Sequence, residues 1–249
     1  MGLHNIIFTI LNGVALIGWS SILLQLLSIT FKFHVESLLA VLPSSFPIVL
    51  LYILEGICLM EVGRIALGHL KGNLILGLVL HAIRLTCLAY VVLADGLQVL
   101  LSLPGPASSN FFEDLKQRRN ILQTSCILYS WSITEVCRYP MYLFPSSDKA
   151  RTIRLVVPII SFPIGCALEA YGAFRVVWPA LFSGDGSGKL GISDIITEIS
   201  WVKPVLLWMV ILINGLLGPT LAYPAMFRKG LPVLMGNTES EMRERSKRE

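Results

Sequence analysis

The sequence predicts an all-α, polytopic membrane protein, and both its composition and the length of its apolar segments support this prediction. Its 249 residues are 54% hydrophobic, only 14% are charged, and the mean hydropathy is +0.70. A soluble domain contains about 25% charged residues, so this chain has too few polar side chains to cover a water-exposed surface. Several apolar segments also reach the roughly 20 residues that an α-helix needs to cross a bilayer.

Six apolar segments are expected to form transmembrane helices. They cover about Asn5–Phe31, Phe46–Gly68, Asn73–Leu103, Asn120–Phe144, Arg151–Trp178 and Ile199–Phe227. The first is expected to be retained, because no basic region or small-residue cleavage site of a signal peptide accompanies it. The charged segment Glu113–Arg119 is expected to be part of a loop. Residues 1–230 are expected to form one six-helix domain, followed by a charged cytosolic tail at 231–249.

The distribution of lysine and arginine predicts the orientation. With a cytosolic N-terminus, the cytosolic segments hold Lys71, Lys149, Arg151, Arg154, Arg228, Lys229 and the basic tail. The opposite side holds Lys32, Lys189 and the group Lys116–Arg119. Basic residues concentrate in cytosolic loops, so both termini are expected in the cytosol.

Other features argue against several classes of function. The net charge is only +4 and the basic residues sit mostly at span ends, which argues against a nucleic-acid partner. The five cysteines lie inside apolar spans, so no disulfide framework is expected. No spacing of His, Cys and carboxylates suggests a metal site, and no cofactor is expected. Cys58 and Arg64 have the Cys-x5-Arg spacing of tyrosine phosphatases, but a continuous helix leaves no N–H groups to cradle phosphate.

Glu169 lies near the middle of the fifth expected span, in RTIRLVVPIISFPIGCALEAYGAFRVVW. A charge at that depth costs about 2.5–3.5 kcal/mol on insertion scales, which makes it a functional hypothesis by default. No basic residue stands three or four positions away. Glu169 must therefore find a partner on another helix or stay protonated, and a carboxyl group poised in this way suits general acid–base chemistry.

Other polar residues at membrane depth leave two interpretations open. The set comprises Glu61, Arg64, His81, Arg84, Glu135, Arg138 and Tyr139. Glu61 with Arg64, and Glu135 with Arg138, are spaced i, i+3, which lets a helix neutralise its own charge. Such pairs either fix helix packing or line an internal polar pocket that binds a substrate. His81 is interpreted as a packed or solvated side chain.

Two motifs resemble those of a known family. Thr134-Glu-Val-Cys-Arg-Tyr139 is similar to Glu-Val-Ile-Arg-Tyr, and Phe162-Pro-Ile-Gly-Cys-Ala-Leu-Glu169 is similar to Tyr-Pro-x-Gly-x-x-x-Glu. Both motifs occur in the 3-hydroxyacyl-CoA dehydratases of very-long-chain fatty acid elongation, also called protein tyrosine phosphatase-like proteins. Weaker similarity covers Asn12 to Trp19, Leu59-Met-Glu61, Arg84 and Tyr223-Pro-Ala-Met, in the same order.

The resemblance implies a six-helix protein of the endoplasmic reticulum membrane that removes water from a long-chain 3-hydroxyacyl-CoA to give a trans-2-enoyl-CoA. The family's catalytic pair, a Tyr and a Glu seven residues apart, corresponds to Phe162 and Glu169. Phe162 is a departure, because phenylalanine has no exchangeable proton, and impaired activity is expected. Arg64 also departs, standing where the family has His.

Substrate binding is expected around this pair, and the acyl chain is expected to occupy an apolar tunnel between helices. The expected binding residues are Arg84, Glu135, Arg138, Tyr139, Gly165, Lys149 and Arg151. Lys149 and Arg151, with Arg154 and Arg228, would meet the phosphates of CoA, or they serve only as positive-inside anchors. Expected partners are membrane lipids, elongase, ketoacyl-CoA reductase and enoyl-CoA reductase.

Two alternatives to a dehydratase remain open. The chain could be a non-catalytic relative that binds acyl-CoA or scaffolds elongase. It could also be a small transporter or channel that uses the intramembrane charges, although no internal repeat indicates a transporter built of two halves.

Overall fold

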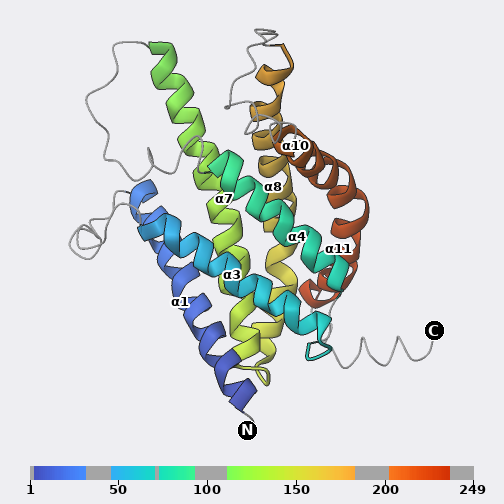
Figure 1. The fold of residues 1–249 in the computed structure, drawn as a ribbon. Helices are drawn as coiled ribbons and strands as arrows, with labels where there is room; N and C mark the ends of the chain where they lie inside the picture. Colours follow the sequence, from blue (N-terminus) through green and yellow to red (C-terminus); the bar gives the residue numbers. More distant parts are fainter. Residues whose placement is uncertain (1–2, 32–45, 71–72, 93–110, 183–201, 236–249) are drawn as a thin grey trace, which may run out of the picture. The chain divides into compact units, whose positions relative to one another are not determined.

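The computed structural model describes residues 3–31, 46–70, 73–92, 111–182 and 202–235, which are helical apart from short turns (Figure 1). The elements are α1 Leu3–Phe31, α3 Phe46–Ala66, α4 Leu74–Cys87, π-helix η1 Leu88–Val92, α7 Phe111–Leu143, α8 Asp148–Phe182, α10 Val202–Leu212, π-helix η3 Ile213–Ala222 and α11 Tyr223–Leu234. None of the described residues forms a strand, and the prediction of an all-α protein is confirmed.

Four helical stretches are long and apolar enough to cross a membrane: Ile6–Ser28, Leu74–Val92, Asp148–Trp178 and Val202–Leu234. They correspond to the first, third, fifth and sixth expected spans. Helices α3 and α7 occupy the second and fourth expected spans but are not among these four. The six-span arrangement therefore stays a prediction. Residues 93–103 of the third span, the first residues of the sixth and the tail from residue 236 lie outside the described residues.

Helix α7 begins earlier than expected. The prediction of a loop at Glu113–Arg119 was wrong, because α7 is helical from Phe111. The segment contains Glu, Leu, Lys, Gln and Arg, which are among the strongest helix formers. Hydropathy shows only which part of a helix is apolar. A helix such as α7 can therefore extend beyond its apolar part into a charged sequence.

The chain divides into two compact units. The first comprises Met1–Leu39, Leu128–Cys166 and Leu217–Glu249, and the second comprises Ala40–Ile127 and Ala167–Leu216. Within the first unit, α1 buries Asn12, Ala15, Trp19, Ile22 and Leu26, whose spacing of three or four residues places them on one face of the helix.

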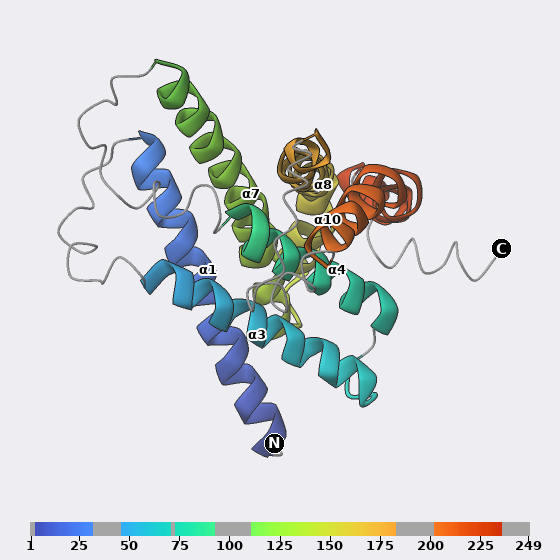
Figure 2. The same ribbon diagram turned by 45° about the horizontal axis from the view of Figure 1, so that its top comes forward.

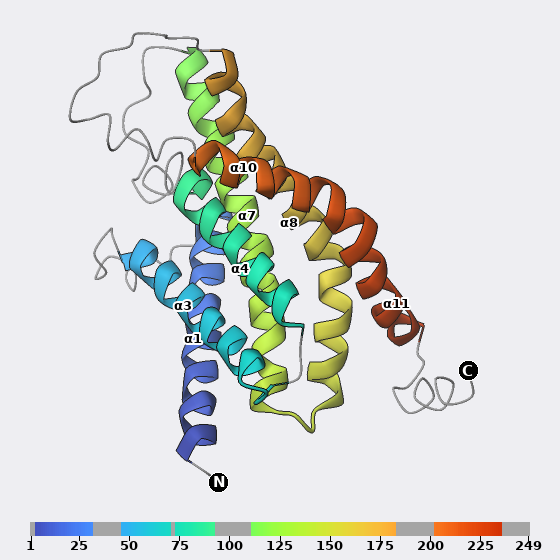
Figure 3. The ribbon, with the colours of Figure 1, turned by 45° about the vertical axis from the view of Figure 1, so that its right-hand side comes forward.

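Helices α7 and α8 run side by side and are joined by a short turn (Figure 3). In the first unit, Ser130 Oγ on α7 donates a hydrogen bond of 2.9 Å to the Ser161 carbonyl on α8. Thr134 Oγ1 lies 3.0 Å from Ser161 Oγ. A Cβ on the buried Gly165 would lie 2.5 Å from Ser130 Oγ. Gly165, expected to bind substrate, thus has a packing role, because a Cβ there would push the Ser130 hydroxyl out of its hydrogen bond to the Ser161 carbonyl.

In the second unit, α4 packs against both α3 and α10 (Figure 2). Asn73 caps α4, since its side-chain oxygen accepts a hydrogen bond of 3.1 Å from the Leu76 N–H. Gly68 follows α3 with a φ of 74°, a left-handed conformation that suits the end of a helix. The adjacent His69 N–H donates to the Arg64 carbonyl at 2.9 Å. The end of α3 at Gly68 and the cap of α4 at Asn73 therefore define the short connection between these two packed helices.

Gly230 on α11 allows a close contact with α8 in the first unit. A Cβ at this position would lie 2.6 Å from the Leu155 carbonyl oxygen and 2.5 Å from Ile159 Cδ1. The first is a backbone atom that cannot rotate away. A Gly230→Ala variant is expected to lose about 1–3 kcal/mol of unfolding free energy, measured in detergent.

Gly13→Ala on α1 is the matched control, because a Cβ there meets nothing within 4 Å. Alanine favours a helix interior by about 0.8–1.0 kcal/mol over glycine, so the control should be neutral or slightly stabilising. If the Gly230→Ala and Gly13→Ala variants are equally stable, α11 does not pack this closely against α8 at Gly230.

Candidate functional site

Glu169 is buried in the second unit, with only 6% of its surface exposed. The Asn214 side-chain amide, from η3, donates a hydrogen bond of 2.6 Å to Glu169 Oε2. Such a donor can orient the carboxyl group. Asn214 sits in a π-helical stretch that contains Pro219, which has no backbone N–H to continue an α-helical ladder.

Phe162, the other residue that the motif resemblance singled out, is half-buried on α8. Helix α8 runs without interruption from Asp148 to Phe182 and therefore carries both Phe162 and Glu169. Their separation of seven residues corresponds to about two helical turns. The phenyl ring of Phe162 has no exchangeable proton.

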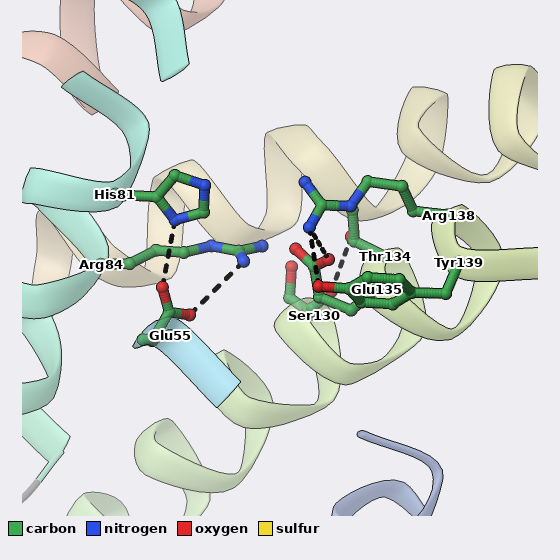
Figure 4. A network of polar contacts seen from close by, with 8 residues as sticks. All are labelled: Glu55, His81, Arg84, Ser130, Thr134, Glu135, Arg138 and Tyr139. Carbon is green, nitrogen blue, oxygen red and sulfur yellow. Dashed lines mark hydrogen bonds and ion pairs between the residues drawn. The ribbon is translucent and has the colours of Figure 1, made fainter. Parts of the chain in front are cut away.

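A buried polar cluster joins α3 and α4 (Figure 4). The Glu55 carboxylate, which is fully buried, lies with Oε2 3.1 Å from His81 Nδ1. Its Oε1 lies 3.6 Å from Arg84 Nη1. The structure thus places Arg84, expected to bind substrate, against a carboxylate. Sequence reasoning missed this role of Glu55, because 26 residues separate it from His81 and no helical spacing links them.

The same cluster includes donor atoms that suit a metal ion. Glu55, Cys58 and His81 are buried, and one ligand atom from each lies within 4.8 Å of the other two. No metal site was expected from the sequence, because the three donors come from two helices and have no recognisable spacing along the chain. All five cysteines are free thiols, as expected.

A second cluster lies on α7 in the first unit (Figure 4). Arg138 Nη2 lies 2.7 Å from Glu135 Oε2, so the expected i, i+3 pair forms. The same nitrogen donates a hydrogen bond of 3.1 Å to the Tyr139 hydroxyl. The guanidinium carbon lies 5.0 Å from the centre of the Tyr139 ring, within cation–π range. Glu135 and Tyr139 are fully buried, so this network sits inside the protein rather than on its surface.

The basic residues near the α7–α8 turn have different surroundings. Lys149 is exposed, as is Arg228 on α11. Arg151 Nη2 donates a hydrogen bond of 2.6 Å to the Pro145 carbonyl and so braces the turn. Arg154 Nη1 lies 2.9 Å from Met141 Sδ, with its guanidinium 5.3 Å from the Tyr142 ring centre. Arg151 and Arg154 therefore have structural contacts whether or not a phosphate binds there.

Comparison with known proteins identifies the family. Neither the curated proteins nor the solved structures contain a significant match to this chain. The family model for "Protein tyrosine phosphatase-like protein, PTPLA" matches residues 55–230. That range covers most of the chain and includes both polar clusters, Phe162, Glu169 and Asn214. The chain therefore belongs to the PTPLA family, the family of the 3-hydroxyacyl-CoA dehydratases.

Proposed function

We propose that this protein is a very-long-chain (3R)-3-hydroxyacyl-CoA dehydratase of the fatty acid elongation cycle, with activity impaired by Phe162. Family membership supports the reaction class. The observation that carries the assignment of the site is the buried carboxyl group of Glu169, held by the Asn214 amide at 2.6 Å. A buried, oriented carboxyl group can exchange a proton with a substrate that itself lies in the membrane.

Dehydration needs two proton transfers. One group takes the proton from C2 of the acyl chain, next to the thioester. The other protonates the C3 hydroxyl group, which leaves as water while the C2–C3 double bond forms. In the proposed scheme Glu169 performs one of these transfers, and a tyrosine at position 162 would perform the other. Phe162 keeps the aromatic ring but has no hydroxyl group, so it can perform neither of the two proton transfers.

The proposal extends to the protein's surroundings. It places six spans around a polar pocket and an apolar tunnel, in the endoplasmic reticulum with both termini cytosolic. Lys149 and Arg151 would meet the phosphates of CoA at the cytosolic mouth. Elongase, ketoacyl-CoA reductase and enoyl-CoA reductase are the proposed neighbours, because they produce or consume the acyl-CoA.

A second candidate function follows from Phe162 itself. A chain that keeps the ring but lacks the phenol could bind acyl-CoA or scaffold elongase without turnover. The deciding experiment mixes purified protein with a long-chain 3-hydroxyacyl-CoA and measures enoyl-CoA. Turnover in the Phe162→Tyr background that disappears on Glu169→Ala supports the dehydratase. Binding of acyl-CoA without Glu169-dependent turnover supports the non-catalytic relative.

Asn214 is a positioning residue in this proposal. An Asn214→Leu variant loses the amide donor, which for a buried partner costs about 1–3 kcal/mol. Where this whole contribution acts in the transition state, the rate falls by about 5- to 150-fold. We expect kcat to fall, KM to stay similar and the pH–rate profile to move, because the change acts on the proton-handling group. The measurement is made in the Phe162→Tyr background.

Gln123→Leu is the control for a loss of helix packing near Glu169 that does not act on its carboxyl group. Gln123 on α7 donates to the Leu168 carbonyl at 3.3 Å, one residue before Glu169, and accepts from Arg175 at 2.5 Å. Its loss should lower stability and leave the pH–rate profile in place. A profile that moves with Gln123→Leu but not with Asn214→Leu contradicts the role of Asn214.

A further inference from the structure

We propose that Glu55, Cys58 and His81 bind a divalent transition-metal ion, with Zn²⁺ as the preferred ion, and that this ion links α3 to α4. The three side chains offer a carboxylate, a thiol and an imidazole, which are the donor types that Zn²⁺ uses in proteins. A soft sulfur and a nitrogen donor disfavour Mg²⁺ and Ca²⁺, which take oxygen ligands.

The separations of the donor atoms fit a tetrahedral ion after small adjustments. Nitrogen and oxygen ligands lie about 2.0–2.2 Å from Zn²⁺, so two of them at a tetrahedral angle are about 3.3–3.5 Å apart. His81 Nδ1 and Glu55 Oε2 are already 3.1 Å apart. All three ligand atoms lie within 4.8 Å of one another. Closing them around one ion therefore needs side-chain shifts of only about 1 Å.

The local fold directs these donors to one place. Glu55 and Cys58 are three residues apart on α3 and so share a helix face. His81 faces them from α4, which packs against α3. Glu55 and Cys58 are 0% exposed and His81 is 2% exposed, so water competes little for the donors.

Charge also fits, provided that Cys58 loses its proton to the solvent when the ion binds. The thiolate and the Glu55 carboxylate then carry two negative charges against the two of the ion and the one of Arg84, and a hydroxide in the fourth position would balance the remaining positive charge. Arg84 Nη1, 3.6 Å from the other Glu55 oxygen, can hold that carboxylate in a single orientation. Hydrogen-bonded partners of this kind commonly orient metal-binding carboxylates. The fourth position is open to water or hydroxide, as in three-ligand zinc sites.

The test uses the purified full-length protein in detergent after removal of metals with a chelator. Co²⁺ is titrated as a spectroscopic substitute for Zn²⁺, since a cobalt–thiolate bond gives a charge-transfer absorption that a nitrogen or oxygen site lacks. We expect one equivalent of Co²⁺ per chain, displacement by Zn²⁺, and a higher unfolding temperature with either ion. Cys58→Ser should abolish the charge-transfer band, and His81→Ala should weaken binding at least tenfold.

Cys166→Ser is the matched control, because Cys166 is another buried free thiol outside the cluster. It should keep the full signal. Absence of cobalt–thiolate absorption in the unmodified protein overturns the proposal without need of any variant. Absorption that persists in Cys58→Ser and disappears in Cys166→Ser also overturns it. Neither readout depends on dehydratase activity.

Discussion

A Phe162→Tyr variant is expected to form enoyl-CoA about 10²- to 10⁴-fold faster than the parent chain, the usual contribution of one general acid or base. The substitution adds one hydroxyl group to a ring that is already in place and half-buried. The added phenol supplies the missing proton-transfer partner for the reaction proposed at Glu169. Initial rates with a long-chain 3-hydroxyacyl-CoA give the measurement.

Phe174→Tyr is the matched control on the same helix. Phe174 is 38% exposed and its ring centre lies 5.1 Å from that of Trp178, so an added hydroxyl group can reach the surroundings without entering the proposed site. The control should leave the rate at the parent level. If Phe162→Tyr is as inert as Glu169→Ala, position 162 does not carry the chemistry and the dehydratase assignment fails.

A Glu55→Ala variant is expected to lose about 3–5 kcal/mol of unfolding free energy, the usual cost of breaking a buried ion pair by removing one partner. The substitution removes the carboxylate that faces both His81 and Arg84. The Arg84 side chain is only 6% exposed, so its charge cannot recover full hydration. Chemical denaturation in detergent, after treatment with a chelator, measures the change.

Two further variants separate the loss of the Glu55 charge from the loss of its side-chain volume. Glu55→Gln keeps an oxygen for the His81 contact and should be intermediate. Adding Arg84→Met to Glu55→Ala should restore part of the loss, because an apolar pair can replace a buried ion pair at little cost. If the Glu55→Ala single variant is as stable as the parent, the cluster does not stabilise the α3–α4 pair.

Hydropathy predicted most of the helical framework, because the apolar segments are long and the polar residues mark their ends. The start of the third span near Asn73 agrees with the observed cap of α4. The start of α7 was placed nine residues too late, since helix propensity continues where apolar character stops. Local spacing also predicted the Glu135–Arg138 pair, which belongs to a single helix.

Contacts between distant segments could not be predicted in this way. Asn214 and Glu169 are 45 residues apart, and the sequence of either helix does not identify which residue on the other is its partner. Glu55 was recognised as part of a span, yet its pairing with His81 depends on how α3 packs against α4. Sequence motifs singled out Glu169, and only the packing of helices showed what holds it.

Helices α3 and α4 each contribute one member of the Glu55–Arg84 pair, which has a consequence for membrane insertion in the six-span arrangement that the sequence predicts. In that arrangement either helix alone would expose a charge to lipid, at about 2.5–3.5 kcal/mol on insertion scales. Together the two charges offset each other across the interface between consecutive helices. The two helices are therefore expected to leave the translocon as a hairpin, after Arg84 has been synthesised, rather than one at a time.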